Sequence, residues 1–169
     1  AHTPFVEVVK LAKKEGYTEP DPRLDLSGED VMRKILILAR ESGYQFDLDE
    51  VMGNSFLPES CQTSRNEADF YLKLASNETH FLKLYQEAES KECKLRYVAS
   101  FQDEKLTTGL SQIGMEHPFY HLEGKDNIVL FYTHRYPEQP LVVKGAGAGA
   151  AVTASGIFAD VMRVANTQQ

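Results

Sequence analysis

The sequence has 169 residues, of which 42% are hydrophobic and 25% are charged. This length and balance predict one globular domain with a sizeable core, and they exclude a disordered or collagen-like chain. The formal net charge is −7, and no run of lysine and arginine exceeds two residues, so nucleic acid is not an expected partner.

The sequence also argues against a membrane span, a disulfide framework and a metal site. The longest apolar stretch without a charge, residues 145–159, is shorter than the roughly 20 residues that cross a bilayer. Cys61 and Cys93 lack C-x-x-C spacing and are too few for a disulfide framework, which predicts a reducing compartment such as the cytoplasm. His117 and His121 have helical spacing, but the proline between them disfavours a zinc-binding helix.

Apolar residues recur at helical spacing in the first half of the chain. The first predicted helix, around Val6 and Val9, ends at Gly16, because glycine favours the left-handed conformation that closes a helix. Residues 19–22 predict a nonhelical loop, since each proline there disfavours helical geometry in the residue before it. Further helices are predicted at residues 27–42, 64–75 and 78–89.

The period of the apolar pattern changes to two after Cys93, which indicates β-strands. Strands are predicted at residues 51–57, 94–101, 106–113, 127–134 and 141–144, and a last helix at 151–164. Helices followed by antiparallel strands predict an α+β fold, in which the helices pack on one face of a mixed, largely antiparallel sheet. We expect residues 1–169 to form a single domain.

Acidic side chains are densest between Glu19 and Lys34. Asp30 and Lys34 share one face of the predicted helix, and Ser27 and Asp30 have the spacing of a capping box at its start. The stiff proline loop can hold Glu19 and Asp25 near that helix start. Such an anionic pocket would suit the ammonium group of an amino acid, with Lys34 as the proton donor. The alternative is that these are ordinary surface ion pairs without a chemical role.

The same segment resembles the signature of homoserine dehydrogenases. The resemblance is carried by Ala12-x3-Gly16-Tyr17-Thr18-x2-Asp21-Pro22-x2-Asp25-Leu26-x-Gly28-x-Asp30-x3-Lys34. The run from Pro140 to Asp160 is similar to the end of that family's catalytic region. The form that the chain resembles most is the one fused to an aspartokinase, because no regulatory domain follows the last predicted helix.

The resemblance implies a role for each matching residue. Lys34 would be the catalytic lysine, and Asp30 the carboxylate that positions it. The substrate site would contain Glu19, Asp25, Tyr17 and Thr18. The family interconverts L-homoserine and L-aspartate 4-semialdehyde with NAD(P), on the route to threonine and methionine. Lys34 would give a proton to the aldehyde oxygen during reduction.

The resemblance also implies the context of the chain. Residues 1–169 would be the substrate-binding and dimerisation domain, which forms a homodimer through its sheet. The nucleotide-binding half and any aspartokinase lie outside this sequence, so we expect the fragment alone to bind no NAD(P) and to be inactive. The expected location is the cytoplasm, or a plastid if the parent is a plant protein.

Gly145, Gly147 and Ala150 match the glycine fingerprint of dinucleotide sites in spacing. The chain that follows is too short for the rest of a β-α-β unit, so a complete nucleotide site is not predicted. One interpretation is that these glycines allow close packing of a strand and a helix. The other is that Gly145, Gly147 and Gly149 line one edge of the cofactor.

Two other functions remain as alternatives. The first is a noncatalytic module that senses an amino acid or supports assembly. The second is a dehydrogenase of another small amino acid, with a pocket of different length. One feature separates the noncatalytic module from an enzyme. In an enzyme, Asp30 and Lys34 should point into a cavity shared with Glu19 and Asp25. A solvent-facing pair would favour the noncatalytic module.

Overall fold

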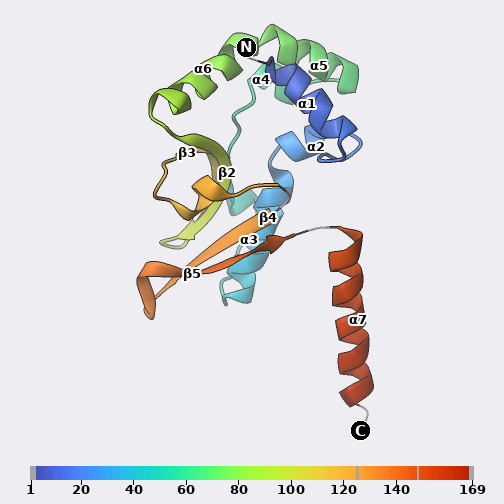
Figure 1. Ribbon diagram of the computed structural model, residues 1–169, viewed down its shortest axis with the longest axis vertical. Helices are drawn as coiled ribbons and strands as arrows, with labels where there is room; N and C mark the ends of the chain where they lie inside the picture. The colour runs from blue at the N-terminus through green and yellow to red at the C-terminus, as the bar shows by residue number, and fades with distance from the viewer. Residues whose placement is uncertain (1–2, 125, 148, 168–169) are drawn as a thin grey trace. The chain divides into compact units, whose positions relative to one another are not determined.

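The computed structural model describes residues 3–124, 126–147 and 149–167. Contacts divide the chain into two compact units, residues 1–120 and 121–169 (Figure 1). The elements of the first unit are α1 (Phe5–Lys14), α2 (Pro22–Leu26), α3 (Glu29–Glu41), η1 (Leu48–Glu50), β1 (Met52–Asn54), α4 (Glu59–Gln62), α5 (Glu67–Ser76), α6 (Glu78–Ser90), β2 (Lys94–Gln102) and β3 (Lys105–Ile113). A 3-10 turn, η2 (Pro118–His121), leads to β4 (Asp126–Thr133), β5 (Tyr136–Ala146) and α7 (Ala150–Thr167).

The predicted α+β class is confirmed, but the strands form two sheets instead of one. In the first unit the strand order is β1-β3-β2, with β1 parallel to β3 and β2 antiparallel to it. In the second unit β4 and β5 form a separate antiparallel pair. The strand predicted at residues 51–57 is only the short β1, because the chain turns away from β3 after Asn54.

Helix α3 packs against β2 and β3 through one face of the three-stranded sheet. Phe101 lies opposite Leu106 in the β2–β3 register, and both pack in a cluster with Leu36 and Ala39 of α3. Since side chains alternate between the faces of a strand, Val98 belongs to the opposite face. The prediction that helices cover one face of the sheet therefore holds for this unit.

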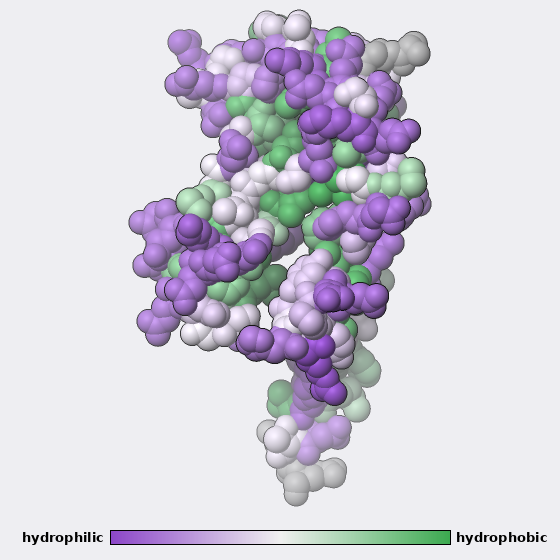
Figure 2. Space-filling model, turned by 90° about the vertical axis from the view of Figure 1, so that its left-hand side faces the viewer, coloured by the Kyte–Doolittle hydropathy of each residue, from purple (hydrophilic) through white to green (hydrophobic). Residues whose placement is uncertain are grey.

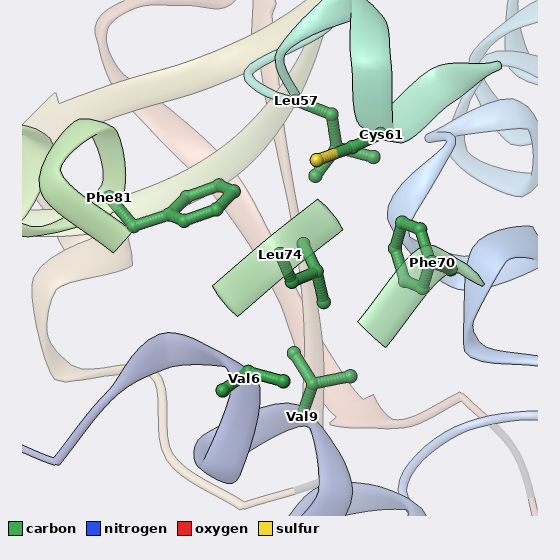
Figure 3. Packing of buried hydrophobic residues seen from close by; sticks show 7 residues of the cluster. All are labelled: Val6, Val9, Leu57, Cys61, Phe70, Leu74 and Phe81. Atoms are coloured by element: carbon green, nitrogen blue, oxygen red, sulfur yellow. The ribbon is translucent and has the colours of Figure 1, made fainter. Parts of the chain in front are cut away.

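A second apolar cluster holds the short helices of the first unit together (Figure 3). Its buried members are Val6, Val9, Leu57, Cys61, Phe70, Leu74 and Phe81, from α1, α4, α5, α6 and the segment before α4. Phe70 and Leu74 are almost fully buried, and α1 contacts both α5 and α6. Burial of such side chains contributes about 1.5–3 kcal/mol each, so this cluster is the main support of the helical part.

The second unit exposes much of its apolar surface. No described residue of α7 is buried, and the helix exposes Val152, Ile157, Phe158, Val161, Met162 and Val164 (Figure 2). On β4 and β5, Phe131, Tyr132, Leu141, Val142 and Val143 are exposed as well. None of the helices in the described residues combines the length and hydropathy of a membrane span.

A glycine closes α1 as the sequence predicts. After α1, Gly16 has a φ of 73°, its N–H donates to the carbonyl of Lys13, and the N–H of Tyr17 donates to the carbonyl of Ala12. This pair of bonds is the Schellman arrangement, which satisfies the last carbonyls of a helix. The spacing of Ala12, Gly16 and Tyr17 in the signature therefore has a structural cause.

The corner between α2 and α3 differs from the expectation. Pro22 begins α2, because the first position of a helix tolerates a residue without an N–H. The capping box predicted for Ser27 and Asp30 does not form. Gly28, with a φ of 77°, is the residue that precedes α3, and the Ser27 hydroxyl accepts the N–H of Glu29 at 3.2 Å.

Gly28 is also required by the space around it. A Cβ atom built on Gly28 would lie 2.1 Å from the hydroxyl oxygen of Tyr97 and 2.6 Å from its Cζ. The Tyr97 ring comes from β2 and meets the ring of Phe56 edge to face. The start of α3 thus packs directly against a tyrosine of the sheet.

We expect Gly28→Ala to destabilise the protein more than Gly43→Ala. Gly43 follows α3 with a φ of 95°, but a Cβ there meets nothing within 4 Å, so this control measures backbone strain alone, about 1–2 kcal/mol. At Gly28 the same strain is joined by overlap with Tyr97, which adds about 1–3 kcal/mol. Urea unfolding of both variants checks this. Equal losses of unfolding free energy in the two variants would mean that the Tyr97 ring moves aside at no cost in free energy.

Candidate functional site

The residues predicted for the substrate and catalytic site lie in one loop and the two helices that follow it in the first unit. Tyr17, Thr18 and Glu19 follow α1, Asp25 lies in α2, and Asp30 and Lys34 lie near the start of α3. All of them belong to one stretch of chain that turns at Gly16 and again at Gly28. The site residues are therefore neighbours along the chain, while contacts with Tyr97 and Ser64 come from distant parts of the sequence.

Glu19 and Asp25 are brought together as predicted. The backbone N–H of Glu19 donates to Oδ2 of Asp25 at 2.9 Å, and both residues are exposed. Thr18 supports the same loop, because its hydroxyl donates to the carbonyl of Glu19 at 3.0 Å. Tyr17 is 53% exposed. The Asp25 carboxylate is thus oriented by the loop, with one oxygen engaged at the Glu19 amide.

Asp30 and Lys34 form the predicted pair. Lys34 Nζ lies 2.7 Å from Asp30 Oδ2, and the side chains are 60% and 65% exposed, respectively. Both project from the face of α3 opposite Leu36 and Ala39, which pack toward the sheet. Among the described residues, the pair therefore faces solvent and does not point into an enclosed cavity shared with Glu19 and Asp25. That outcome is the one expected for the noncatalytic alternative.

Arg23 is a site-bordering residue that the sequence analysis missed. Its Nε donates to Asp21 Oδ1 at 2.9 Å, its Nη2 to Asp21 Oδ2 at 2.5 Å, and its Nη1 to the carbonyl of Ser64 at 3.1 Å. Asp21 also accepts the backbone N–H of Arg23 and so caps α2. Hydrogen bonds from Arg23 lower the pKa of the Asp21 carboxyl below its usual value. An aspartate followed by a proline at a helix start could have identified the cap, but nothing local indicates the bond to Ser64.

The three glycines proposed for the cofactor edge lie in the second unit. Gly145 is the last residue but one of β5 and lies opposite Asn127, and a Cβ there would meet nothing within 4 Å. A Cβ on Gly147 would overlap the Asn127 amide, at 1.7 Å from Nδ2, and Gly149 has a φ of 126° just before α7. Local structure thus explains the glycines at 147 and 149, whereas none of the described residues gives a steric cause for the glycine at 145.

The described residues contain no group of three or more His, Cys, Asp and Glu side chains placed to hold a metal ion. Three aspartates of this segment instead accept hydrogen bonds or form ion pairs. Asp25 accepts the N–H of Glu19, Asp21 pairs with Arg23, and Asp30 pairs with Lys34. A cluster of carboxylates without such partners would be needed for a hard cation. The chemistry that these side chains support is recognition of a cation and transfer of a proton.

Comparison with known proteins gives the same family as the signature. A family model described as homoserine dehydrogenase matches residues 1–162. The chain is 47% identical over 163 residues to the chloroplastic bifunctional aspartokinase/homoserine dehydrogenase 1 of Arabidopsis thaliana, covering 95% of this chain and 18% of that protein. It is 40% identical over 163 residues to the homoserine dehydrogenase of Schizosaccharomyces pombe, covering 95% of this chain and 43% of that protein.

A solved structure shares the fold along nearly the whole chain. It is a Candida auris protein of unknown function, matched with a TM-score of 0.88 and 39% identity over 98% of this chain and 47% of that one. The resemblance inferred from the signature, including the likeness to bifunctional enzymes, is confirmed. The chain spans less than half the length of these relatives.

Proposed function

The chain belongs to the homoserine dehydrogenase family, and from that premise we propose that it is the substrate-binding part of an oxidoreductase that interconverts L-homoserine and L-aspartate 4-semialdehyde with NAD(P). One observation carries the proposal. The Asp30–Lys34 pair lies at 2.7 Å on the helix that follows the corner holding Asp25, so a proton-transfer group and an ammonium-binding group share one short segment. The cytoplasm or a plastid is the proposed location.

The residues divide the chemistry between binding and proton transfer. Asp25, fixed at the Glu19 amide, binds the α-ammonium group of the substrate, together with the Glu19 carboxylate. Lys34 gives a proton to the aldehyde oxygen during reduction, and Asp30 keeps the Lys34 ammonium in place. In oxidation the hydroxyl proton leaves through a water or through the deprotonated fraction of Lys34. The exposure of the pair is consistent with a site closed by other parts of a longer protein, as ligand sites between domains are.

The described residues fit one edge of a dinucleotide and not the whole group. β5 and α7 provide a glycine-rich strand-to-helix turn, but β4 pairs antiparallel with β5, so the described residues of the second unit form no parallel β-α-β unit. NAD(P), when bound, accepts or supplies the hydride. We propose that Gly145 lets the backbone approach that cofactor, which is consistent with the open space at its Cβ position.

Lys34→Ala should lower kcat for homoserine by about 100-fold or more, because it removes the group that moves the proton. The side chain is 60% exposed and lies on a helix, so the fold should be unaffected. Steady-state assays of the protein that carries this sequence test it, with Lys83→Ala as the control, since Lys83 forms a comparable exposed pair with Glu87 on α6. A folded Lys34→Ala variant with near-normal turnover would exclude Lys34 as the catalytic group.

Asp25→Asn and Glu19→Gln should mainly raise KM for homoserine, because each removes a negative charge that binds the ammonium group. We expect about tenfold for Asp25→Asn, the size typical of one lost charge-assisted hydrogen bond. The KM for the nucleotide serves as the internal control and should not change. Unchanged kinetics in both variants would remove these residues from the substrate site.

The noncatalytic module is a second candidate, because Asp30 and Lys34 face solvent in this chain. A dehydrogenase of another small amino acid is a third. An activity assay with homoserine and a panel of related hydroxy amino acids separates all three. Turnover that is highest with homoserine supports the proposal, turnover that is higher with another substrate favours the third candidate, and ligand binding without turnover favours the second.

We propose that the chain forms a homodimer through its sheet. Helices α3 and α6 contact the three-stranded sheet, and the face that carries Val98 and Ser100 is opposite to the α3-covered side chains. Val98 and Ser100 are half-buried, so this face of the sheet is only partly covered. Partly exposed sheet surface favours association, and two-fold dimers are the commonest soluble assemblies.

Light scattering of residues 1–169 at micromolar concentration should give twice the mass of one chain. The same sample should neither bind NADP(H) tightly nor oxidise homoserine, because the described residues form no complete nucleotide site. A monomer would contradict the first expectation, and homoserine-dependent NADPH production would contradict the second.

A further inference from the structure

We infer that Arg23 is a positioning residue, which holds α2 in the orientation that places the Asp25 carboxylate at the Glu19 amide. The inference rests on the proposed function, in which Asp25 binds the substrate ammonium. Arg23 itself would not touch the substrate. Its effect would reach the site through the backbone of a five-residue helix.

The guanidinium of Arg23 joins two parts of the first unit. Through Nε and Nη2 it holds both oxygens of Asp21, the residue that caps α2, at 2.5–3.0 Å. Through Nη1 it donates to the carbonyl of Ser64, between α4 and α5, at 3.1 Å. These bonds require a planar group with several donors in a fixed geometry, which arginine provides and lysine does not.

Helix α2 needs such a directional anchor because its packing is incomplete. A helix of one or two turns has no stability of its own. Pro22 is fully buried and Leu26 packs on the apolar cluster around Phe70, but these contacts fix no single rotation of the helix. A hollow of about 220 Å³ also lies beside α2, lined by Arg23, Ser27, Ser55, Leu57, Cys61, Gln62 and Phe70.

Helical geometry connects Arg23 to Asp25. Successive residues are about 100° apart around a helix, so Arg23 and Asp25 flank the buried stripe of Pro22 and Leu26 on opposite sides. The stripe therefore acts as an axis about which α2 can turn. The bonds of Arg23 stop that rotation on one side, and the Asp25 carboxylate keeps its 2.9 Å contact with the Glu19 N–H on the other.

The test compares Arg23→Gln and Arg23→Lys with Arg33→Gln in the protein that carries this sequence. Arg33 is a matched control, because it also pairs with a carboxylate, Glu29 at 2.8 Å, but within one exposed face of α3. Steady-state kinetics give kcat and KM for homoserine and KM for the nucleotide, and thermal unfolding reports stability. Asp25→Asn is measured alongside.

We expect Arg23→Gln to raise KM for homoserine about tenfold, with kcat and the KM for the nucleotide within about twofold of the parent protein. Arg23→Lys should show an intermediate rise, because it retains the charge and loses the planar geometry. Arg33→Gln should not change KM. This split between KM and kcat separates positioning from a general loss of structure.

Three results would overturn the inference. If Asp25→Asn raises KM and both Arg23 variants leave it unchanged, the inference fails and the proposed function stands. If Asp25→Asn leaves KM unchanged in an active enzyme, the substrate site and the inference fail together. If Arg23→Lys, the milder change, melts much earlier than the parent protein and alters kcat and both KM values equally, Arg23 has only a structural role.

Discussion

The contact between Gly28 and Tyr97 is the constraint on which the arrangement of the candidate site depends. The chain must turn between α2 and α3 within two residues, and it does so directly against a tyrosine hydroxyl of β2. Only glycine combines the left-handed backbone with the absence of a Cβ at this position. Because α3 is also buried against β2 and β3 through Leu36 and Ala39, the corner fixes where Asp30 leaves the backbone.

Stability and the proposed function are carried by different residues in the first unit. Apolar clusters around Phe70 and Leu106 provide the burial, whereas the charged residues of the site form exposed pairs. An exposed ion pair contributes only about 0–1 kcal/mol to stability. The Asp30–Lys34 pair can therefore serve proton transfer without being needed for the fold, which is why substitutions there should act on activity first.

The second unit is in a different physical situation. A two-stranded hairpin is at best marginally stable in water, and α7 exposes Phe158 and other large apolar side chains along its length. Exposed apolar area of this extent costs free energy unless another surface covers it. The surface of this unit is therefore typical of a segment that packs against a further protein surface, whether within a longer chain or in an assembly.

The sequence by itself determined the features that depend on neighbours along the chain. Spacing over a few residues predicts the ends of helices at Gly16 and Gly43 and the β2–β3 hairpin. It also predicts the Asp30–Lys34 pair and the family signature. Tertiary structure alone decided the contact of Gly28 with Tyr97 and the hydrogen bond from Arg23 to Ser64. It also decided the division into two sheets and the exposure of the site. These features join residues far apart in sequence, and no local period or propensity encodes which distant surfaces meet.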